Sequence, residues 1–218
     1  GWPLLLGYFL LPWLNWDGRQ AVLFDLPARK FHILGLTFWP QDFPLLAFLL
    51  IISAYSLFAV TVIAGRIWCG YTCPQTVWTS IFMFLEQKTE GSRNQRIKRD
   101  QGRWTLDKVV RKTLKHGSWL FVAFATGMTF VGYFYPVKDL AYELATFSTG
   151  IWQFSWTVFF TCATYINAGW MREQVCKYMC PYARFQAVMF DQDTLIVSYD
   201  PQRGENRGSR KRGSDYQA

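Results

Sequence analysis

Long apolar runs dominate the pattern of hydrophobic and polar positions along the chain. Residues 43–65, 117–137 and 144–171 contain no charged side chain, and each run is long enough to cross a bilayer as a helix, which takes roughly 20 apolar residues. The first 16 residues are also uncharged, although they form a shorter run. The pattern predicts an all-α membrane protein with four transmembrane helices, whose approximate ranges are 1–14, 44–67, 116–135 and 150–170.

The segments between these runs carry shorter patterns. The runs AVLFDL (21–26) and FHILGLTFW (31–39) are rich in β-branched and aromatic residues and flank a turn containing proline, which predicts a small extracytoplasmic β-hairpin. Residues 74–91 and 182–192 have apolar positions at helical spacing, which predicts two short amphipathic helices, the first of about three turns. A further amphipathic helix is expected from Leu106 into the third span, after a basic loop.

Positive charge alternates between successive connections. Lys and Arg gather in 86–115 and 172–218, whereas 17–42 holds three of them and 136–149 holds only Lys138. This alternation is the positive-inside pattern, and it predicts that the two basic segments lie in the cytoplasm and the hairpin outside. The net charge of +8 is therefore explained by the orientation of the loops in the membrane. Membrane lipid is an expected partner and nucleic acid is not.

The composition separates a membrane domain from a tail. Over the chain, 51% of residues are hydrophobic and 19% are aromatic, which is more than an ordinary soluble domain carries. Residues 1–198 are predicted to form one polytopic membrane domain. Residues 199–218 are polar, basic and glycine-rich, and are predicted to be a linker toward a further domain.

The motif Cys-x-Tyr-x-Cys-Pro occurs twice, at 69–74 and at 176–181. Each copy follows a span that ends at the cytoplasmic side and precedes a predicted amphipathic helix. The chain is therefore predicted to contain two pseudo-repeats, each with a cytoplasmic CxxxCP turn, that share one orientation in the membrane.

The position of proline predicts how the cysteines meet the following helices. Proline is favoured at the first helical position, so that Cys73 and Cys180 are candidate N-caps. The partial positive charge of a helix N-terminus is expected to lower the pKa of a thiol there. The nearby cations Arg66, Lys177 and Arg184 are expected to add to that effect.

Four thiolates brought together by the repeat would form one metal site, consisting of Cys69, Cys73, Cys176 and Cys180. Soft thiolate ligands select Cu(I), Zn or iron–sulfur centres, and the Cys-x3-Cys spacing differs from the Cys-x2-Cys of zinc ribbons. A mononuclear metal, a shared cluster and two separate dithiols remain open at this point. A permanent disulfide is not expected, because the cytosol keeps thiols reduced.

The fifth cysteine and the two histidines are weaker candidates for a metal or catalytic site. Cys162 lies inside the fourth predicted span without a partner cysteine and is expected to serve packing. His32 and His116 are expected on opposite sides of the membrane, which excludes their joint ligation of a haem. His116 is interpreted as an interfacial histidine, with a ligand role as the alternative.

Two long stretches carry a resemblance to a known family. GRIWCGYTCPQTVWT with FLEQKTEG, and EQVCKYMCPYARFQAVMFDQDTLIVSYDPQRGENRGSRKR, closely resemble the cytochrome c oxidase accessory protein family (CcoG, FixG, RdxA), and the resemblance spans nearly all 218 residues. It implies a multi-pass protein of the bacterial cytoplasmic (inner) membrane that carries iron–sulfur clusters and assists the assembly of cbb3-type oxidase. Its implied partners are copper ions, cbb3-type oxidase subunits and copper-delivery proteins, and a dimer is left open.

The resemblance also implies where the cofactors lie. Family members continue into a ferredoxin-like domain with two [4Fe–4S] clusters, then a further span and an extracytoplasmic domain. The two clusters are accordingly expected only in a segment beyond residue 218. Copper or iron is expected at the four-cysteine site, which corresponds to the family's two membrane-proximal motifs.

These inferences combine into one predicted function with alternatives. The chain is predicted to belong to an oxidoreductase that reduces Cu(II) to Cu(I) for oxidase assembly, because soft sulfur ligands favour the reduced ion. A quinol-oxidising iron–sulfur membrane anchor similar to NapH and NosR is the first alternative. A thiol–disulfide oxidoreductase and a non-catalytic assembly scaffold are the others.

Overall fold

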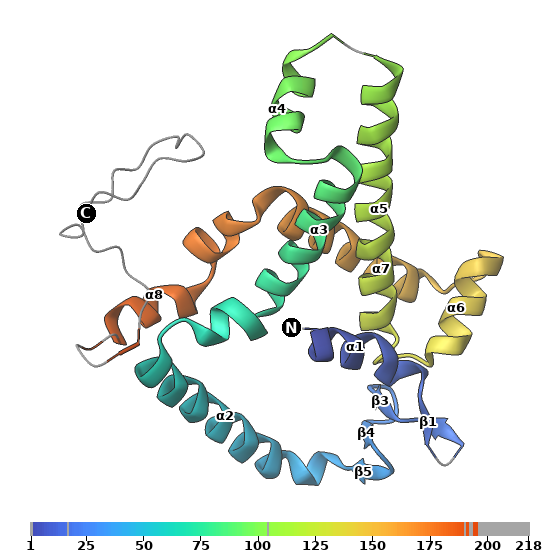
Figure 1. The fold of residues 1–218 in the computed structure, drawn as a ribbon. Coiled ribbons are helices and arrows are strands. Elements are labelled where there is room, and N and C mark those ends of the chain that lie inside the picture. The colour runs from blue at the N-terminus through green and yellow to red at the C-terminus, as the bar shows by residue number, and fades with distance from the viewer. Residues whose placement is uncertain (1, 17, 104, 190, 192–193, 196–218) are drawn as a thin grey trace.

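The computed structural model describes residues 2–16, 18–103, 105–189, 191 and 194–195, and it is mostly helical with a small sheet (Figure 1). The predicted linker, residues 199–218, lies outside the described residues. Within the described part, one helix, Pro40–Ala64, is long and apolar enough to cross a membrane. The other three membrane crossings stay predictions, although their segments are helical.

The helices follow the apolar and amphipathic patterns of the chain. In chain order they are α1 (Trp2–Leu10), α2 (Phe43–Ala64), α3 (Pro74–Glu90), α4 (Arg93–Gln101), α5 (Leu106–Val131), α6 (Val137–Thr146), α7 (Ile151–Thr164) and α8 (Pro181–Met189). Short 3-10 turns, η1 (Leu11–Trp13) and η2 (Pro40–Asp42), follow α1 and precede α2. The wider turns of a π-helix form η3 (Trp68–Thr72), η4 (Tyr165–Met171) and η5 (Val175–Met179).

The first predicted span contains α1, a helix of nine residues, and its crossing of the membrane stays a prediction. Two expectations about the other helices need correction. The predicted helix after the first motif has 17 residues, more than three turns, before it ends at Gly91 with φ 83. The predicted basic loop contains α4, because Ser92 and Gln95 form a capping box in which the Ser92 N–H donates to Gln95 Oε1 at 3.0 Å.

The predicted hairpin is confirmed and is part of a larger sheet. β3 (Val22–Asp25) pairs antiparallel with β4 (Lys30–Ile33), which pairs with β5 (Leu36–Phe38). The second predicted strand breaks in two at Leu34 and Gly35, whose φ values of 47 and 88 suit a tight hairpin turn. A shorter ribbon, β1 (Asn15–Trp16) with β2 (Arg19–Gln20), precedes this sheet.

The helical core forms where α5 packs against α7 and α3. Gly127 allows the close approach of α5 and α7, since a Cβ there would lie 2.7 Å from Thr161 Oγ1 and 2.8 Å from the Thr157 carbonyl oxygen. Such small-residue contacts are typical of helix packing in membranes. A buried cluster of Phe82, Trp119, Ala123 and Ala168 then joins α3 to α5 and η4. This core holds α3, and with it the first cysteine turn, against the second half of the chain.

Candidate functional site

The two cysteine turns have the same local structure. The N–H of Cys73 donates to the Trp68 carbonyl at 2.9 Å, and the N–H of Cys180 donates to the Val175 carbonyl at 2.9 Å. Both bonds reach back five residues, as in a π-helix. Cys73 is the N-cap of α3, as predicted, and Cys180 directly precedes α8.

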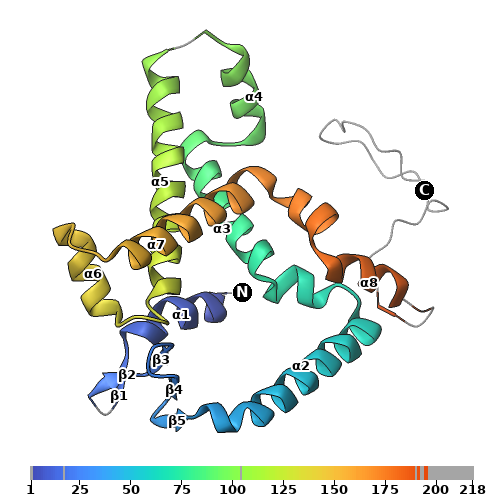
Figure 2. The same cartoon turned by 180° about the vertical axis from the view of Figure 1, so that it is seen from behind.

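Each turn is followed by a helix that packs on the other half of the chain. Figures 1 and 2 show α8 beside the C-terminal end of α2, and α3 beside η4. The element after each motif thus contacts the element before the other motif. The two halves of the predicted repeat are therefore joined by reciprocal contacts.

Hydrogen bonds from two glutamine side chains stabilise these contacts between the two halves. Gln186 of α8 is buried and donates from Nε2 to the Gly65 carbonyl at 2.9 Å. Gln75 of α3 donates to the carbonyls of Arg172 at 3.0 Å and Asn167 at 2.9 Å. Gly65 and Arg172 occupy equivalent places before the two motifs. A glutamine of each half therefore hydrogen-bonds to the equivalent backbone carbonyl of the other half.

The exchange brings the predicted site cysteines near one another. Burial raises the pKa of the Cys69 thiol, and the nearby Cys73, Cys180 and Cys176 raise it further. Burial, Cys73, Cys180 and Glu173 raise the pKa of the Cys176 thiol. Four charged thiolates at this spacing would therefore repel one another, and a bound cation would relieve the repulsion.

The thiols inside the turns, Cys69 and Cys176, have a raised pKa. Of the three cations expected to lower it, Arg66 acts on Cys69, but burial and the other thiols outweigh it. These two cysteines lie inside the π turns, away from the helix N-termini, so the helix dipole does not compensate.

The four cysteines are close but do not form a closed metal site. Within the described part of the chain, no three side chains of His, Cys, Asp or Glu are grouped so that they could hold one metal ion. The Cys69 thiol instead donates to Gln186 Oε1 at 3.6 Å. Ligation by these cysteines therefore stays a prediction. His116 hydrogen-bonds through Nδ1 to the Tyr165 hydroxyl at 2.7 Å.

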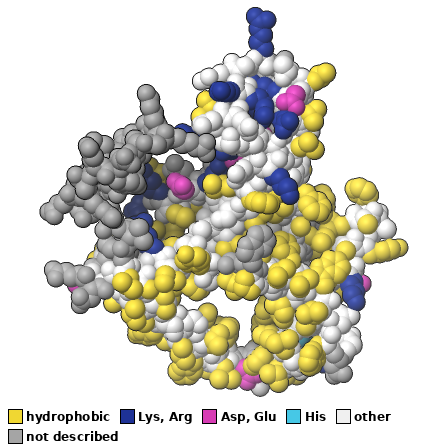
Figure 3. Space-filling view, in the orientation of Figure 1, with side chains coloured by type: hydrophobic (Ala, Val, Ile, Leu, Met, Phe, Trp, Pro, Cys, Tyr) yellow, Lys and Arg dark blue, Asp and Glu magenta, His cyan; other side chains and the backbone are white. Residues whose placement is uncertain are grey.

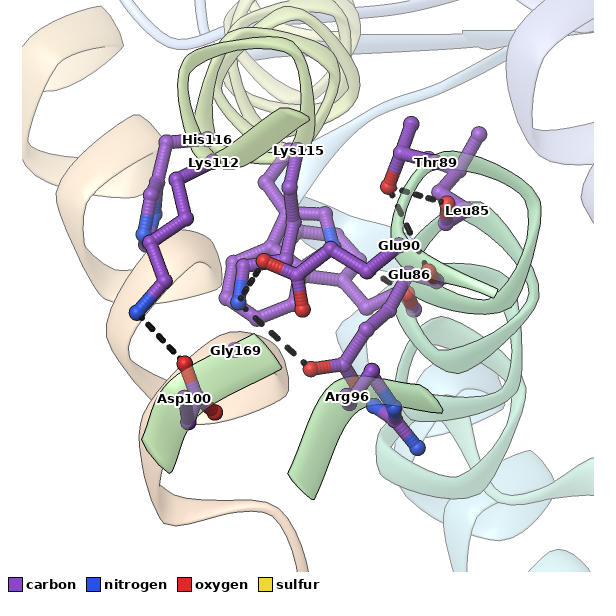
Figure 4. Close-up of polar contacts among 12 residues, drawn as sticks. Leu85, Glu86, Thr89, Glu90, Arg96, Asp100, Lys112, Lys115, His116 and Gly169 are labelled. Atoms are coloured by element: carbon purple, nitrogen blue, oxygen red, sulfur yellow. Dashed lines mark hydrogen bonds and ion pairs between the residues drawn. The ribbon is translucent and has the colours of Figure 1, made fainter. Parts of the chain in front are cut away.

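A buried ion-pair cluster lies at the C-terminal part of α3 and was not anticipated from the sequence. Glu86 Oε2 lies 2.7 Å from Arg96 Nη1 and 2.9 Å from Arg172 Nη2. Figure 4 shows Lys115 of α5 reaching between Glu86 and Glu90 of α3, with Nζ at 3.6 and 3.1 Å from their Oε1 atoms. The cluster joins α3, α4 and α5 to the segment that leads into the second motif.

The electrostatics of Glu86 follow from these contacts. Burial alone would raise the pKa of Glu86, but hydrogen bonds from Arg96 and Arg172 outweigh burial and hold the pKa below its ordinary value. The available sequence signal was the spacing of Glu86 and Glu90, which places both carboxylates on one face of a helix.

Family models identify the class of protein. A model described as "4Fe-4S binding domain" matches residues 46–89, which include the first motif. A model described as "4Fe-4S dicluster domain" matches residues 171–217, which include the second motif. The segments that contain the two cysteine turns thus match iron–sulfur binding domains, which is the class of protein that they indicate.

Curated relatives identify the family. The chain is 42% identical over 92% of its length to "Nitrogen fixation protein FixG" of Rhizobium meliloti, and 42% and 41% identical over 93% and 94% of its length to "Protein RdxA" and "Protein RdxB" of Cereibacter sphaeroides. The chain belongs to the FixG/RdxA family. It spans 39% to 44% of the length of these relatives. No solved structure matches the chain.

The number of cysteines limits which clusters these residues fit. Each [4Fe–4S] cluster takes four cysteine ligands, and the chain has five cysteines, of which Cys162 is exposed on α7. The four motif cysteines thus provide the donors for one cluster and not for two. The expectation that clusters belong only beyond residue 218 needs revision, because both cluster-binding models match inside the chain.

Proposed function

We propose that this chain is the membrane domain of an electron-transfer protein that reduces Cu(II) to Cu(I) for the assembly of a cbb3-type cytochrome c oxidase. The proposed site consists of Cys69, Cys73, Cys176 and Cys180, at the cytoplasmic face of the bacterial inner membrane. The observation that carries the proposal is the pair of equivalent cysteine turns, held together by the exchange of α3 and α8.

The surface supports the proposed membrane location. Only 6% of the most apolar segment of the helix Pro40–Ala64 is buried inside the structure. Its side chains are therefore expected to contact lipid or another protein. Figure 3 shows hydrophobic side chains spread over the α2 side of the molecule, whereas Lys and Arg gather over α4 and the start of α5. This division agrees with the proposed orientation, in which the basic end and the cysteine turns face the cytoplasm.

The proposed reaction transfers one electron to Cu(II), and the protons that the cysteines release on binding copper pass to solvent. A reduced iron–sulfur cluster of the whole protein donates one electron and is oxidised by one electron, and Cu(II) becomes Cu(I). The motif cysteines lose their protons on binding copper, and their soft sulfur atoms favour Cu(I) over the harder Cu(II). Repulsion among the four sulfurs favours the bound cation further.

Serine substitutions test the proposal. In the purified full-length protein, Cys69→Ser and Cys176→Ser are expected to lower cupric reduction, followed with a chromogenic Cu(I) chelator, by at least about tenfold. Cys162→Ser is the matched control, because Cys162 lies outside both motifs. Unchanged reduction and metal content in the motif variants would refute the proposal, and unchanged oxidase assembly in metal-free variants would favour a scaffold.

A cavity favours a second candidate function, the oxidation of quinol by an iron–sulfur anchor. A cavity of about 320 Å³ lies between α1 and α3, and it is lined by Leu5, Gly70, Tyr71, Thr76, Val77, Ser80, Ile81 and Phe84. Mostly apolar walls with a few hydroxyl groups suit the head group of a lipid-soluble quinol, and Gly70 and Tyr71 belong to the first cysteine turn. In this case the four cysteines would hold one [4Fe–4S] cluster.

Elemental analysis and EPR separate the two candidates. Iron at the motif cysteines, with a cluster signal that quinol reduces, is the result expected of the anchor. Copper bound by the same cysteines, with a signal lost on reduction to Cu(I), is the result expected of the reductase.

A further inference from the structure

Arg172 has a backbone conformation that usually requires glycine. Its φ is 43, and the residue at the equivalent place in the first half is Gly65. A side chain in this conformation strains the backbone, and such strain persists only where the surrounding contacts hold the residue in place. The presence of arginine where glycine would fit without strain indicates that the guanidinium has a role here.

The guanidinium of Arg172 joins the segment before the second cysteine turn to α3 and α5. Its Nη2 lies 2.9 Å from Glu86 Oε2, and its Nε donates to the Gly169 carbonyl at 2.9 Å. The guanidinium carbon lies 5.5 Å from the centroid of the Trp119 ring, which is within the range of cation–π attraction. These contacts hold the side chain in place and offset the strain of the backbone.

The backbone of Arg172 is held by the other end of the same helix. Gln75 Nε2 donates to the Arg172 carbonyl at 3.0 Å, and the Arg172 N–H donates to the Asn167 carbonyl at 2.8 Å. Gln75 and Glu86 are separated by about three helical turns, so both side chains lie on one face of α3. Arg172 is therefore fixed at two points along α3, near its start and toward its end.

These contacts connect the two cysteine turns. Cys73 directly precedes α3, and three residues separate Arg172 from Cys176. At the equivalent place in the first half, the carbonyl of Gly65 accepts a hydrogen bond from Gln186. Arg172 adds to the same kind of backbone contact a side-chain attachment that a glycine cannot provide.

We propose that Arg172 is a positioning residue that sets the separation of the two cysteine turns. It holds the segment that leads to Cys176 against the helix that follows Cys73, so that the sulfur atoms of both turns remain near one another. Arg172 acts through the backbone and through α3, not by contact with the copper ion. The inference rests on the proposed function, since the separation serves electron transfer only if the four cysteines bind copper.

Arg96 provides a matched control for a geometric test. Its Nη1 lies 2.7 Å from the same Glu86 Oε2, but Arg96 belongs to α4 and precedes no cysteine turn. Arg172→Gln and Arg96→Gln therefore each remove one cation from Glu86. The probe is a short bismaleimide, which is applied to the full-length protein in a Cys162→Ser background without added metal.

The measurement is the rate at which the bismaleimide joins the first turn to the second, followed by mass spectrometry of the cross-linked peptides. Arg172→Gln is expected to lower this rate several-fold, because the second turn is no longer held against α3. Arg96→Gln is expected to leave the rate unchanged. A native rate in Arg172→Gln, or an equal loss in both variants, would overturn the proposal.

A glycine at position 172 separates the guanidinium from the strain of the backbone. Arg172→Gly removes the side chain and suits the positive φ, so this variant is expected to fold even if Arg172→Gln does not. It is expected to slow the cross-linking as Arg172→Gln does. A native rate in Arg172→Gly would show that the guanidinium does not position the turn.

Copper binding gives a second readout. Because residues that orient metal ligands affect metal affinity, Arg172→Gln is expected to weaken the binding of Cu(I), the product ion, about tenfold. The affinity is measured by competition with the chromogenic Cu(I) chelator, and Arg96→Gln is expected to bind as the native protein does. Equal affinities in the two variants would show that the position of the turn does not serve copper binding.

The cysteine variants separate this inference from the proposed function. If Arg172→Gln slows the cross-linking but Cys69→Ser and Cys176→Ser leave cupric reduction and metal content unchanged, the proposed function fails and the positioning of the turn stands. If the cysteine variants lose cupric reduction but Arg172→Gln cross-links as the native protein does, the role of Arg172 alone fails.

Discussion

Gly65 and Arg172, which stand 107 residues apart, share one uncommon backbone conformation. Their φ and ψ are 53 and −108 at Gly65, and 43 and −111 at Arg172. Each carbonyl accepts a hydrogen bond from a glutamine of the other half. This conformation ends the preceding helix and redirects the chain into the cysteine turn. The repeat is therefore visible in the backbone geometry as well as in the motif.

A side chain at Gly65 is expected to destabilise the fold. Gly65→Ala forces an L-residue into a sparsely allowed region of φ and ψ, at a cost of about 1–3 kcal/mol. The measurement is the free energy of unfolding of the full-length protein in mixed micelles. Gly7→Ala is the control, because a Cβ at this helical position meets nothing within 4 Å, and equal effects of both substitutions would contradict the strain argument.

The close contact of α5 and α7 gives a second prediction. Gly127→Ala pushes a methyl group against Thr161 and the Thr157 backbone, and it is expected to lower the free energy of unfolding by about 1–3 kcal/mol. Gly117→Ala in the same helix meets no atom within 4 Å and is expected to be neutral or slightly stabilising. Similar unfolding of the two variants would show that α5 and α7 do not pack this closely.

The buried Glu86 predicts a dependence of stability on pH. Its folded-state pKa lies below the ordinary 4.5, because hydrogen bonds from Arg96 and Arg172 outweigh burial. A depressed pKa stabilises the fold above the unfolded value, and this contribution is lost as pH falls through the folded value. The free energy of unfolding of the native protein is therefore expected to fall on acidification below about pH 4.5.

Glu86→Gln should remove this dependence and destabilise the fold at neutral pH. Three cations would lose their buried carboxylate, at a cost of about 3 kcal/mol, and the pH profile should be flatter between native and acid conditions. Asp100→Asn is the control, since Asp100 is largely exposed where it pairs with Lys112, and it is expected to cost less than about 1 kcal/mol. If the free energy of unfolding of Glu86→Gln depended on pH as in the native protein, the acid dependence would not come from Glu86.

The shared location of the cysteine turns predicts a chemical cross-link between the two halves. In a Cys162→Ser background, a short bismaleimide is expected to join a cysteine of the first motif to one of the second. Trypsin cleavage at Arg103, between α4 and α5, should then leave the fragments connected on a denaturing gel. Fragments that separate after full modification of the thiols would place the two turns apart.

The sequence predicts the parts of the fold that depend on local pattern. Apolar runs and amphipathic spacing place the main helices, and Cys-Pro places Cys73 at the start of α3. The capping box of Ser92 and Gln95 was also readable, although the density of charge around it suggested a loop. The motif spacing predicted the two halves and their four cysteines, but it did not predict that the helix after each motif packs on the other half.

The remaining features depend on contacts between distant residues. The positive φ of Arg172 has no local signal, because arginine gives no hint of a conformation that usually requires glycine. When the two motifs are aligned, Gln75 and Gln186 fall at positions one helical turn apart. The repeat alone therefore does not identify them as equivalent residues. The raised pKa of Cys69 also has no local signal, since the thiols that raise it come partly from the other half.

The exchange of α3 and α8 also sets an order of events during biosynthesis. Gln186, which secures the first cysteine turn, leaves the ribosome long after that turn has been made. A nascent chain therefore presents Cys69 and Cys73 before the second half that packs against them has been made. During that interval the first turn lacks the hydrogen bond from the Gln186 side chain to the Gly65 carbonyl.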